Sequence, residues 1–115
     1  MTESPIPLPV VEEEEKADAD EHARLQPPYN VILLDDDDHT FDYVIRMLQA
    51  LFGYPPEKGY LMACEVHNTG RVIVLTTTLE HAELKRDQIH ASGPDRDLKR
   101  SKGSMSAYIE PVEDN

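Results

Sequence analysis

The stretch YNVILLDDDDHTF, residues 29–41, decides the fold of this chain. Its first six residues are aromatic, β-branched or aliphatic apart from one asparagine, and this composition predicts a buried strand. Four consecutive aspartates follow, Asp35 to Asp38, and apolar residues then recur at helical spacing from Phe41 to Phe52. The four acids therefore lie on a short turn between a strand and a helix.

The charge of this turn leaves two interpretations open. Four like charges repel one another unless solvent, a helix N-terminus or a bound cation relieves them. In the first interpretation, Asp38 or Thr40 caps the helix and the other carboxylates face water. In the second, the turn binds a positively charged group.

The residues after the first helix predict a second helix. Gly53-Tyr54-Pro55-Pro56 ends the first helix, and Pro55 or Pro56 begins the next, because proline is tolerated in a first helical turn. The second helix runs to about Asn68, where Asn68-Thr69-Gly70 supplies a stop with a left-handed position.

The C-terminal part predicts two strands around a third helix. Residues 71–76, RVIVLT, form a β-prone run, and one of three threonines at 76–78 caps the helix that follows. Ser92-Gly93-Pro94 ends this helix, a polar loop runs to Lys102, and residues 104–109 alternate as a short last strand. The order βααβαβ predicts an α+β fold, a three-stranded sheet packed against three helices.

Composition limits both the domain count and the partners. The chain has 115 residues, enough for one small domain, and its 23 acidic against 11 basic residues give a net charge of −12. This charge argues against nucleic acid as a partner. Residues 1–28 hold five prolines and eight acids against two bases, which predicts a disordered extension before a domain at 29–112.

The single cysteine and the first residues bear on the compartment. Cys64 has no partner for an internal disulfide and cannot build a cysteine-based zinc cluster, which fits a reducing environment. Residues 1–11 contain three prolines, an acid and no basic region, so they do not resemble a secretory signal. We therefore expect a cytoplasmic protein without a membrane partner.

The stretch from Tyr29 to about Ile89 resembles ClpS, the adaptor family of the Clp AAA+ protease that captures proteins by a destabilising N-terminal residue. The shared features occur in order and without a gap: the strand that ends in aspartates, Tyr43-Val44-Ile45, Leu61-Met62 leading to Val66-His67, the strand that Gly70 initiates, and Glu80 to Lys85.

The resemblance implies a site for a free α-amino group. A protonated amine carries three N–H donors and no acceptor, so it needs convergent acceptors. By the family pattern, these are Asp35, Asp36, Asp37 and His67, the last brought beside the end of the first strand by the second helix. The family usually has asparagine where Asp35 stands, and shifting the register by one residue would select Asp36 to Asp38 instead.

The resemblance also implies an apolar pocket for the first side chain of the bound protein. Phe41 and Val44 would form one wall, Ala63 and Val66 the other, and Met105 of the last strand the floor. Two methionines commonly guard this pocket in the family, and here the corresponding residues are Phe41 and Ala63. We therefore expect the preference among Phe, Tyr, Trp and Leu to differ from that of the family.

Glu80 and Lys85 match positions that in the family contact the N-terminal domain of the unfoldase, of ClpA or ClpC type. The resemblance thus implies a monomeric adaptor rather than an enzyme, without a cofactor, which delivers N-degron proteins for degradation. The acidic extension would be engaged by the unfoldase pore.

A small cation-binding module is the alternative. Asp35 to Asp38 could hold Ca²⁺ or Mg²⁺, and an aspartate with His39 or His67 could hold a transition metal. Contiguous acids point alternately away from one ion and lack the glycine of a calcium loop, so we expect no metal site. A hydrolase is disfavoured because the chain has no nucleophile motif, HExxH or glycine-rich phosphate loop.

Overall fold

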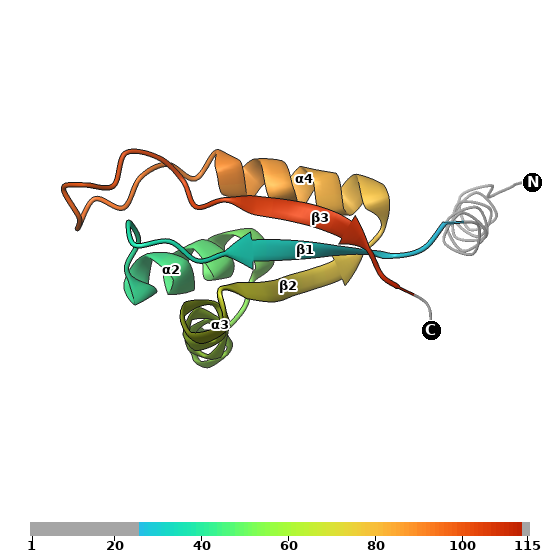
Figure 1. The fold of residues 1–115 in the computed structure, drawn as a ribbon, viewed down its shortest axis with the longest axis horizontal. Coiled ribbons are helices and arrows are strands. Elements are labelled where there is room, and N and C mark those ends of the chain that lie inside the picture. The colour runs from blue at the N-terminus through green and yellow to red at the C-terminus, as the bar shows by residue number, and fades with distance from the viewer. Residues whose placement is uncertain (1–25, 114–115) are drawn as a thin grey trace, which may run out of the picture.

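The computed structural model describes residues 26–113, so the predicted extension 1–28 lies outside the described residues except for its last three. The elements in chain order are β1 (Tyr29–Leu34), α2 (Phe41–Phe52), α3 (Pro56–Thr69), β2 (Arg71–Thr77), α4 (Leu79–His90) and β3 (Ala107–Pro111). This confirms the predicted α+β fold and its βααβαβ order (Figure 1).

The sheet has the strand order β2-β1-β3, and both pairings are antiparallel. Tyr29 at the start of β1 lies opposite Thr77 of β2 and Pro111 of β3. Further along β1, Leu33 lies opposite Ala107 of β3. Strand β1 is the central strand, and the four aspartates begin directly after its last residue, Leu34. The segments that adjoin β2 and β3 at this end of the sheet therefore flank the aspartates.

One face of the sheet carries the core. Alternate strand residues on this face are buried, as expected for side chains with a period of two: Val31, Leu33, Val72, Val74 and Ala107. They pack with buried residues of all three helices, among them Leu48, Ala63 and Ile89. On the other face, Ile32 is fully buried, and its cross-strand neighbours are Ile73 and Tyr108.

Local sequence sets the helix boundaries. The hydroxyl of Thr40 accepts a hydrogen bond from the backbone nitrogen of Tyr43 at 3.1 Å and so caps α2. The hydroxyl of Thr78 accepts one from His81 at 3.3 Å and caps α4. Of the two caps considered for the first helix, Asp38 and Thr40, it is Thr40 that caps α2, and the prediction of a threonine within 76–78 as the cap of α4 is confirmed by Thr78.

Helices α2 and α3 approach each other closely at Gly59. This glycine is buried, and a β-carbon added to it would lie 3.3 Å from Cα of Ile45 in α2. Helix α3 then ends at Gly70, which has φ of 91° as the predicted stop requires. The start of α2 also lies near the C-terminal part of α3, since the ring centroid of Phe41 lies 5.5 Å from that of His67.

The predicted strand over residues 104–109 is wrong in its bounds, because residues 91–106 form one long connection before β3. The Ser104 hydroxyl accepts a hydrogen bond from the nitrogen of Gly93 at 2.6 Å, so it serves the loop rather than the sheet. Met105, predicted on the strand, therefore precedes it, although its side chain is buried in the core.

Among residues 26–113, none of the helices combines the length and the apolar character needed to span a membrane.

Candidate functional site

The four aspartates form an acidic turn, residues 35–38, that is held from two sides. The nitrogen of Leu34 donates to the carbonyl oxygen of Ser106 at 3.0 Å, and the nitrogen of Asp35 donates to that of Gly70 at 3.0 Å. Gly70 directly follows α3, so the turn starts beside the end of that helix. His67, one turn earlier in α3, therefore lies on a segment adjacent to Asp35.

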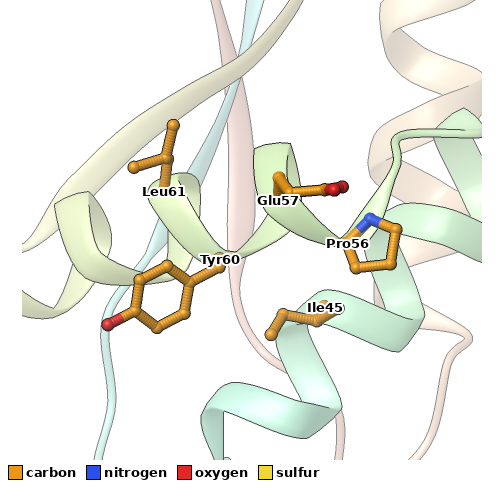
Figure 2. A pocket seen from close by; sticks show the side chains of 5 residues that line it. All are labelled: Ile45, Pro56, Glu57, Tyr60 and Leu61. Atoms are coloured by element: carbon orange, nitrogen blue, oxygen red, sulfur yellow. The ribbon is translucent and has the colours of Figure 1, made fainter.

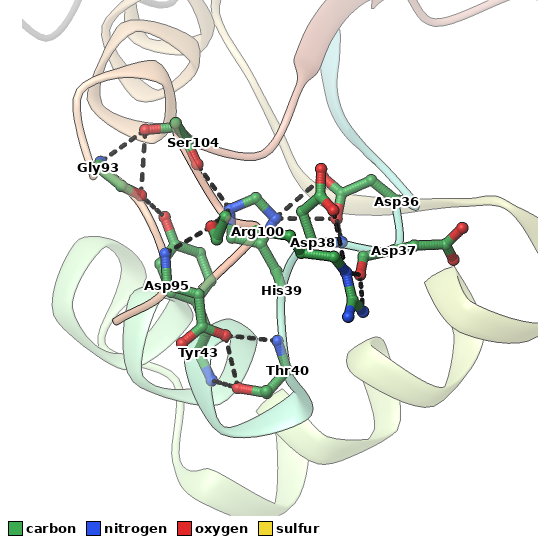
Figure 3. Close-up of polar contacts among 12 residues, drawn as sticks. Asp36, Asp37, Asp38, His39, Thr40, Tyr43, Gly93, Asp95, Arg100 and Ser104 are labelled. Carbon is green, nitrogen blue, oxygen red and sulfur yellow. Dashed lines mark hydrogen bonds and ion pairs between the residues drawn. The ribbon is translucent and has the colours of Figure 1, made fainter. Parts of the chain in front are cut away.

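The carboxylates of the acidic turn have different surroundings. Asp36 accepts hydrogen bonds from the nitrogen of Asp38 at 2.9 Å and lies 2.8 Å from Nδ1 of His39. Asp38 lies 3.3 Å from Nε of Arg100. Asp35 and Asp37 are exposed, and neither carboxylate has a hydrogen bond or ion pair within residues 26–113. Figure 3 shows the Asp37 side chain pointing away from His39.

His39 has a structural role that the sequence analysis did not predict. Its side chain is only 3% exposed. Nδ1 faces the Asp36 carboxylate, and Nε2 lies 2.8 Å from the carbonyl oxygen of Gly103. The ring also packs 4.5 Å from that of Tyr43. Both ring nitrogens are therefore engaged, which leaves no nitrogen for the metal-ligand role considered for this residue.

Asp95 is a second buried polar residue that the sequence analysis missed. It is 1% exposed, and its carboxylate accepts hydrogen bonds from the nitrogen and hydroxyl of Thr40 at 2.6 and 2.8 Å. Burial raises the pKa of Asp95, but the bonds from Thr40 and Asp97, with the charge of His39, outweigh it and hold the pKa below the ordinary value. The carboxylate is thus stabilised in its charged form.

Tyr43 joins α2 to the same loop. Its hydroxyl donates to the carbonyl oxygen of Gly93 at 2.5 Å. Burial raises the pKa of Tyr43, a hydrogen bond with Ser104 lowers it, and the charges of Asp95 and Asp36 raise it, with an overall increase. The phenol therefore stays neutral and keeps its donor.

His67 and Phe41 lie beside each other across α3 and α2. His67 is exposed, and its ring centroid lies 5.5 Å from that of Phe41 in an edge-on arrangement. Phe41 also lies 6.1 Å from the ring of Tyr60. The half-buried phenylalanine therefore separates the region of His67 from the exposed surface around Tyr60.

The other residues predicted to line a pocket belong to the core. Val44, Ala63, Val66 and Met105 are each at most 3% exposed and form part of one apolar cluster, against which Phe41 packs. The structure thus brings all five predicted residues together, and Phe41 alone among them is half-buried.

An open hollow of about 470 Å³ lies on the outer side of α2 and α3 (Figure 2). Its lining is apolar apart from one acid and consists of Ile45, Pro56, Glu57, Tyr60 and Leu61. None of these residues was predicted to line a pocket. Tyr60 and Leu61 are 52% and 67% exposed, and such exposed apolar side chains in a helix are the signal that could have drawn attention to this surface.

The two residues predicted to contact an unfoldase lie on α4. Glu80 is exposed in its first turn. Lys85 is half-buried, because its ammonium donates to the carbonyl oxygen of Leu51 at 2.5 Å and lies 5.3 Å from the ring centre of Phe52. Lys85 therefore stabilises the end of α2, which the sequence analysis did not predict.

Within residues 26–113, the structure contains no group of three or more His, Cys, Asp or Glu residues arranged to hold a metal ion. The alternative interpretation of the acidic turn as a cation module therefore gains no support from the geometry.

The family model of the ATP-dependent Clp protease adaptor protein ClpS matches residues 24–99. Adapter proteins ClpS of Pectobacterium carotovorum subsp. carotovorum and Vibrio atlanticus are 38% and 37% identical over 69 and 71 residues, 58% and 60% of this chain. That of Desulforapulum autotrophicum is 34% identical over 64 residues, 56% of this chain. The matches span 65%, 67% and 62% of these relatives, respectively.

A solved structure, Agrobacterium tumefaciens ClpS2 bound to L-phenylalaninamide, has the same fold. It superposes with a TM-score of 0.65 at 23% identity, and the superposition covers 75% of this chain and 98% of that chain.

Proposed function

This chain belongs to the ClpS family of ATP-dependent Clp protease adaptor proteins, and we propose that it binds proteins with a bulky hydrophobic N-terminal residue and delivers them to a Clp AAA+ unfoldase. One observation carries the proposal: the acidic turn presents two exposed carboxylates, Asp35 and Asp37, and its first residue bonds to Gly70, which directly follows the helix α3 that bears His67. The ligand of the ClpS2 structure, L-phenylalaninamide, combines a free α-amino group with an aromatic side chain.

The proposed amine site consists of Asp35, Asp37 and His67. The two carboxylates lie two residues apart, are exposed and have no internal partner within residues 26–113. They accept hydrogen bonds from the ammonium, and a ring nitrogen of His67 supplies a third acceptor. Asp36 contributes its negative charge without contacting the ammonium, because its carboxylate already bonds to the nitrogen of Asp38 and to the ring of His39.

The proposed pocket for the first side chain lies in the apolar cluster behind Phe41. Val44, Ala63, Val66 and Met105 supply apolar walls, and Phe41, half-buried beside His67, is the residue that moves aside when a side chain enters. Phe41 thus replaces a flexible methionine with a rigid ring at the entrance. Ala63 leaves more room on the opposite wall.

Delivery uses the outer surface of α4. We propose that Glu80 contacts the N-terminal domain of a ClpA-type or ClpC-type unfoldase, and that Lys85 supports this surface through its bond to Leu51. The protein acts as a monomer, without catalysis, in the cytoplasm. The net charge of −12 suits a partner with a basic docking face.

Fluorescence anisotropy with short labelled peptides tests the proposal. Peptides that begin with Phe, Leu, Tyr or Trp are each compared with the N-acetylated form and with a peptide that begins with Gly. We expect binding of the free peptides only, since acetylation removes the ammonium that the carboxylates recognise. Equal binding of free and acetylated peptides, or of none, would contradict the proposal.

His67→Ala provides the matched site variant, and His81→Ala on α4 is its control. Both side chains are exposed, but His81 lies on a different helix from the proposed site. Loss of an acceptor to an ammonium should weaken binding about tenfold in His67→Ala. His81→Ala should bind as the unmodified protein does.

A further inference from the structure

The connection between α4 and β3 contains a segment, residues 92–106, that we call the anchor loop. It packs back against the acidic turn and the start of α2 (Figure 3). Its polar contacts to that region come from residues spread along its length: Gly93, Asp95, Arg100, Ser101, Gly103 and Ser106. The loop therefore contacts this region at several points along its length rather than at one.

His39 is the bridge between the acidic turn and the anchor loop. Its Nδ1 lies 2.8 and 3.0 Å from the two oxygens of Asp36, and its Nε2 lies 2.8 Å from the carbonyl oxygen of Gly103. The ring therefore lies between two acceptors, the carboxylate of Asp36 and the carbonyl oxygen of Gly103, which belong to segments far apart in the chain.

Arg100 holds the turn from the other side. Its guanidinium donates through Nε to the carbonyl oxygen of Asp37 at 2.8 Å and through a second nitrogen to the same oxygen. Nε also lies 3.3 Å from the carboxylate of Asp38. A planar guanidinium can make these contacts together, which a point charge cannot.

The base of the anchor loop is fixed by Asp95. Its backbone nitrogen donates a hydrogen bond to the hydroxyl of Ser101 at 2.8 Å, which links two residues of the loop. Its carboxylate accepts a hydrogen bond from the backbone nitrogen of Thr40. Asp95 is also buried. Arg100 and the carbonyl oxygen of Gly103 therefore belong to a loop that is hydrogen-bonded at its base.

We infer that the anchor loop positions the proposed amine site: His39 and Arg100 engage Asp36 and Asp38, so that Asp35 and Asp37 remain outside for the ammonium. This inference rests on the proposed function. It assigns His39 and Arg100 a positioning role, because they contact the aspartates and not the ligand. Without them, the four carboxylates are free to rotate and repel one another, and the outward pair loses its fixed geometry.

The test measures the affinity for a labelled Phe-initiated peptide in His39→Gln, Arg100→Gln and Arg100→Lys. The matched controls are His81→Gln on α4 and Lys102→Gln, which removes one positive charge from the same loop; neither control side chain has a hydrogen bond or ion pair within residues 26–113. Circular dichroism and thermal melting report folding for each variant. Arg100 is 62% exposed, so its replacement leaves the core intact.

We expect His39→Gln and Arg100→Gln to bind about fivefold more weakly, Arg100→Lys to be intermediate, and both controls to bind normally.

Two results would overturn the inference while leaving the proposed function intact. In the first, the unmodified protein binds the free peptide and Arg100→Gln binds it at least as tightly, as simple removal of a positive charge predicts. In the second, the unmodified protein binds the free peptide and His39→Gln binds it as tightly as His81→Gln does. Absence of binding by the unmodified protein overturns the proposed function and the inference that rests on it.

Discussion

The carboxylate of Asp95 accepts hydrogen bonds from both the backbone nitrogen and the hydroxyl of Thr40, at 2.6 and 2.8 Å, across 55 residues of chain. The same Thr40 hydroxyl accepts from the nitrogen of Tyr43 and caps α2. The start of α2, the acidic turn before it and the anchor loop are therefore one hydrogen-bonded unit.

Replacing Asp95 by alanine should destabilise the protein substantially. The buried carboxylate accepts bonds from Thr40 and from the nitrogen of Asp97, and alanine leaves these donors unpaired. We expect the free energy of unfolding to fall by about 2 to 4 kcal/mol in urea denaturation. Asp97→Ala is the control: its side chain is 63% exposed and makes one 3.7 Å contact with Arg46, so a loss below about 0.5 kcal/mol is expected. Similar losses for both would contradict the assigned role.

The stability of the protein should depend on pH through Asp95. Its pKa is lower in the folded chain than the ordinary value of 3.8, so the folded state binds its proton less readily than the unfolded state. The stabilisation is therefore complete above that ordinary value and decreases as pH falls through the lower folded value. In melting curves, the difference between the unmodified protein and Asp95→Asn should be constant near neutrality and shrink below about pH 4. A difference that does not change with acidification would show that the carboxylate charge is irrelevant.

Asp35 and Asp37 should matter for peptide binding more than a nearby acid outside the turn. Each alanine variant removes one acceptor to the ammonium, which should weaken binding of a Phe-initiated peptide about tenfold. Asp42→Ala removes the same charge from the exposed first turn of α2 and serves as the control. Equal effects for all three variants would mean that net charge, rather than the outward pair, attracts the ligand.

Replacing Phe41 by alanine should lower the stability of the protein and also change its preference among N-terminal side chains. The half-buried ring packs on the apolar cluster, so Phe41→Ala should lose about 2 kcal/mol, less than the loss for a fully buried phenylalanine. Because the entrance widens, affinity for a Trp-initiated peptide should rise relative to a Leu-initiated one by about fivefold. Peptide titrations check this, with Leu84→Ala on α4 as the control for loss of an exposed apolar side chain. If the ratio of the affinities for the Trp-initiated and Leu-initiated peptides does not change, Phe41 does not line the entrance of the pocket.

Glu80→Lys should affect delivery without affecting capture. The residue lies on α4, away from the acidic turn, so peptide affinity is expected to stay within twofold, while affinity for a purified unfoldase N-terminal domain should fall about tenfold. Calorimetric titration measures the second quantity. Glu83→Lys on the same exposed helix surface controls for the change of charge. If both variants weaken unfoldase binding equally, general electrostatics and not Glu80 determines docking.

Much of the candidate site could be predicted from the sequence because its signals are local. The aspartate run directly after Leu34 fixed the place of the turn, and Gly70 fixed the end of α3. Helical spacing brought Val44 and Ala63 into one cluster, as the pattern of apolar residues required. The bounds of β3 could not be predicted in the same way, because the hydroxyl of Ser104 bonds to the loop instead of facing solvent.

The sequence by itself determined the order of elements, the position of the acidic turn and the few residues among which the caps of α2 and α4 lie, since each depends on residues within a few positions of one another. Only the tertiary structure decided which carboxylates of the turn point outward, that His39 and Asp95 are buried, and that Lys85 bonds to Leu51. The reason is physical: apart from the local bonds of Asp36 to Asp38 and His39, these features depend on hydrogen bonds between residues 34 to 64 positions apart. Four identical aspartates differ only in the partners that folding brings to them.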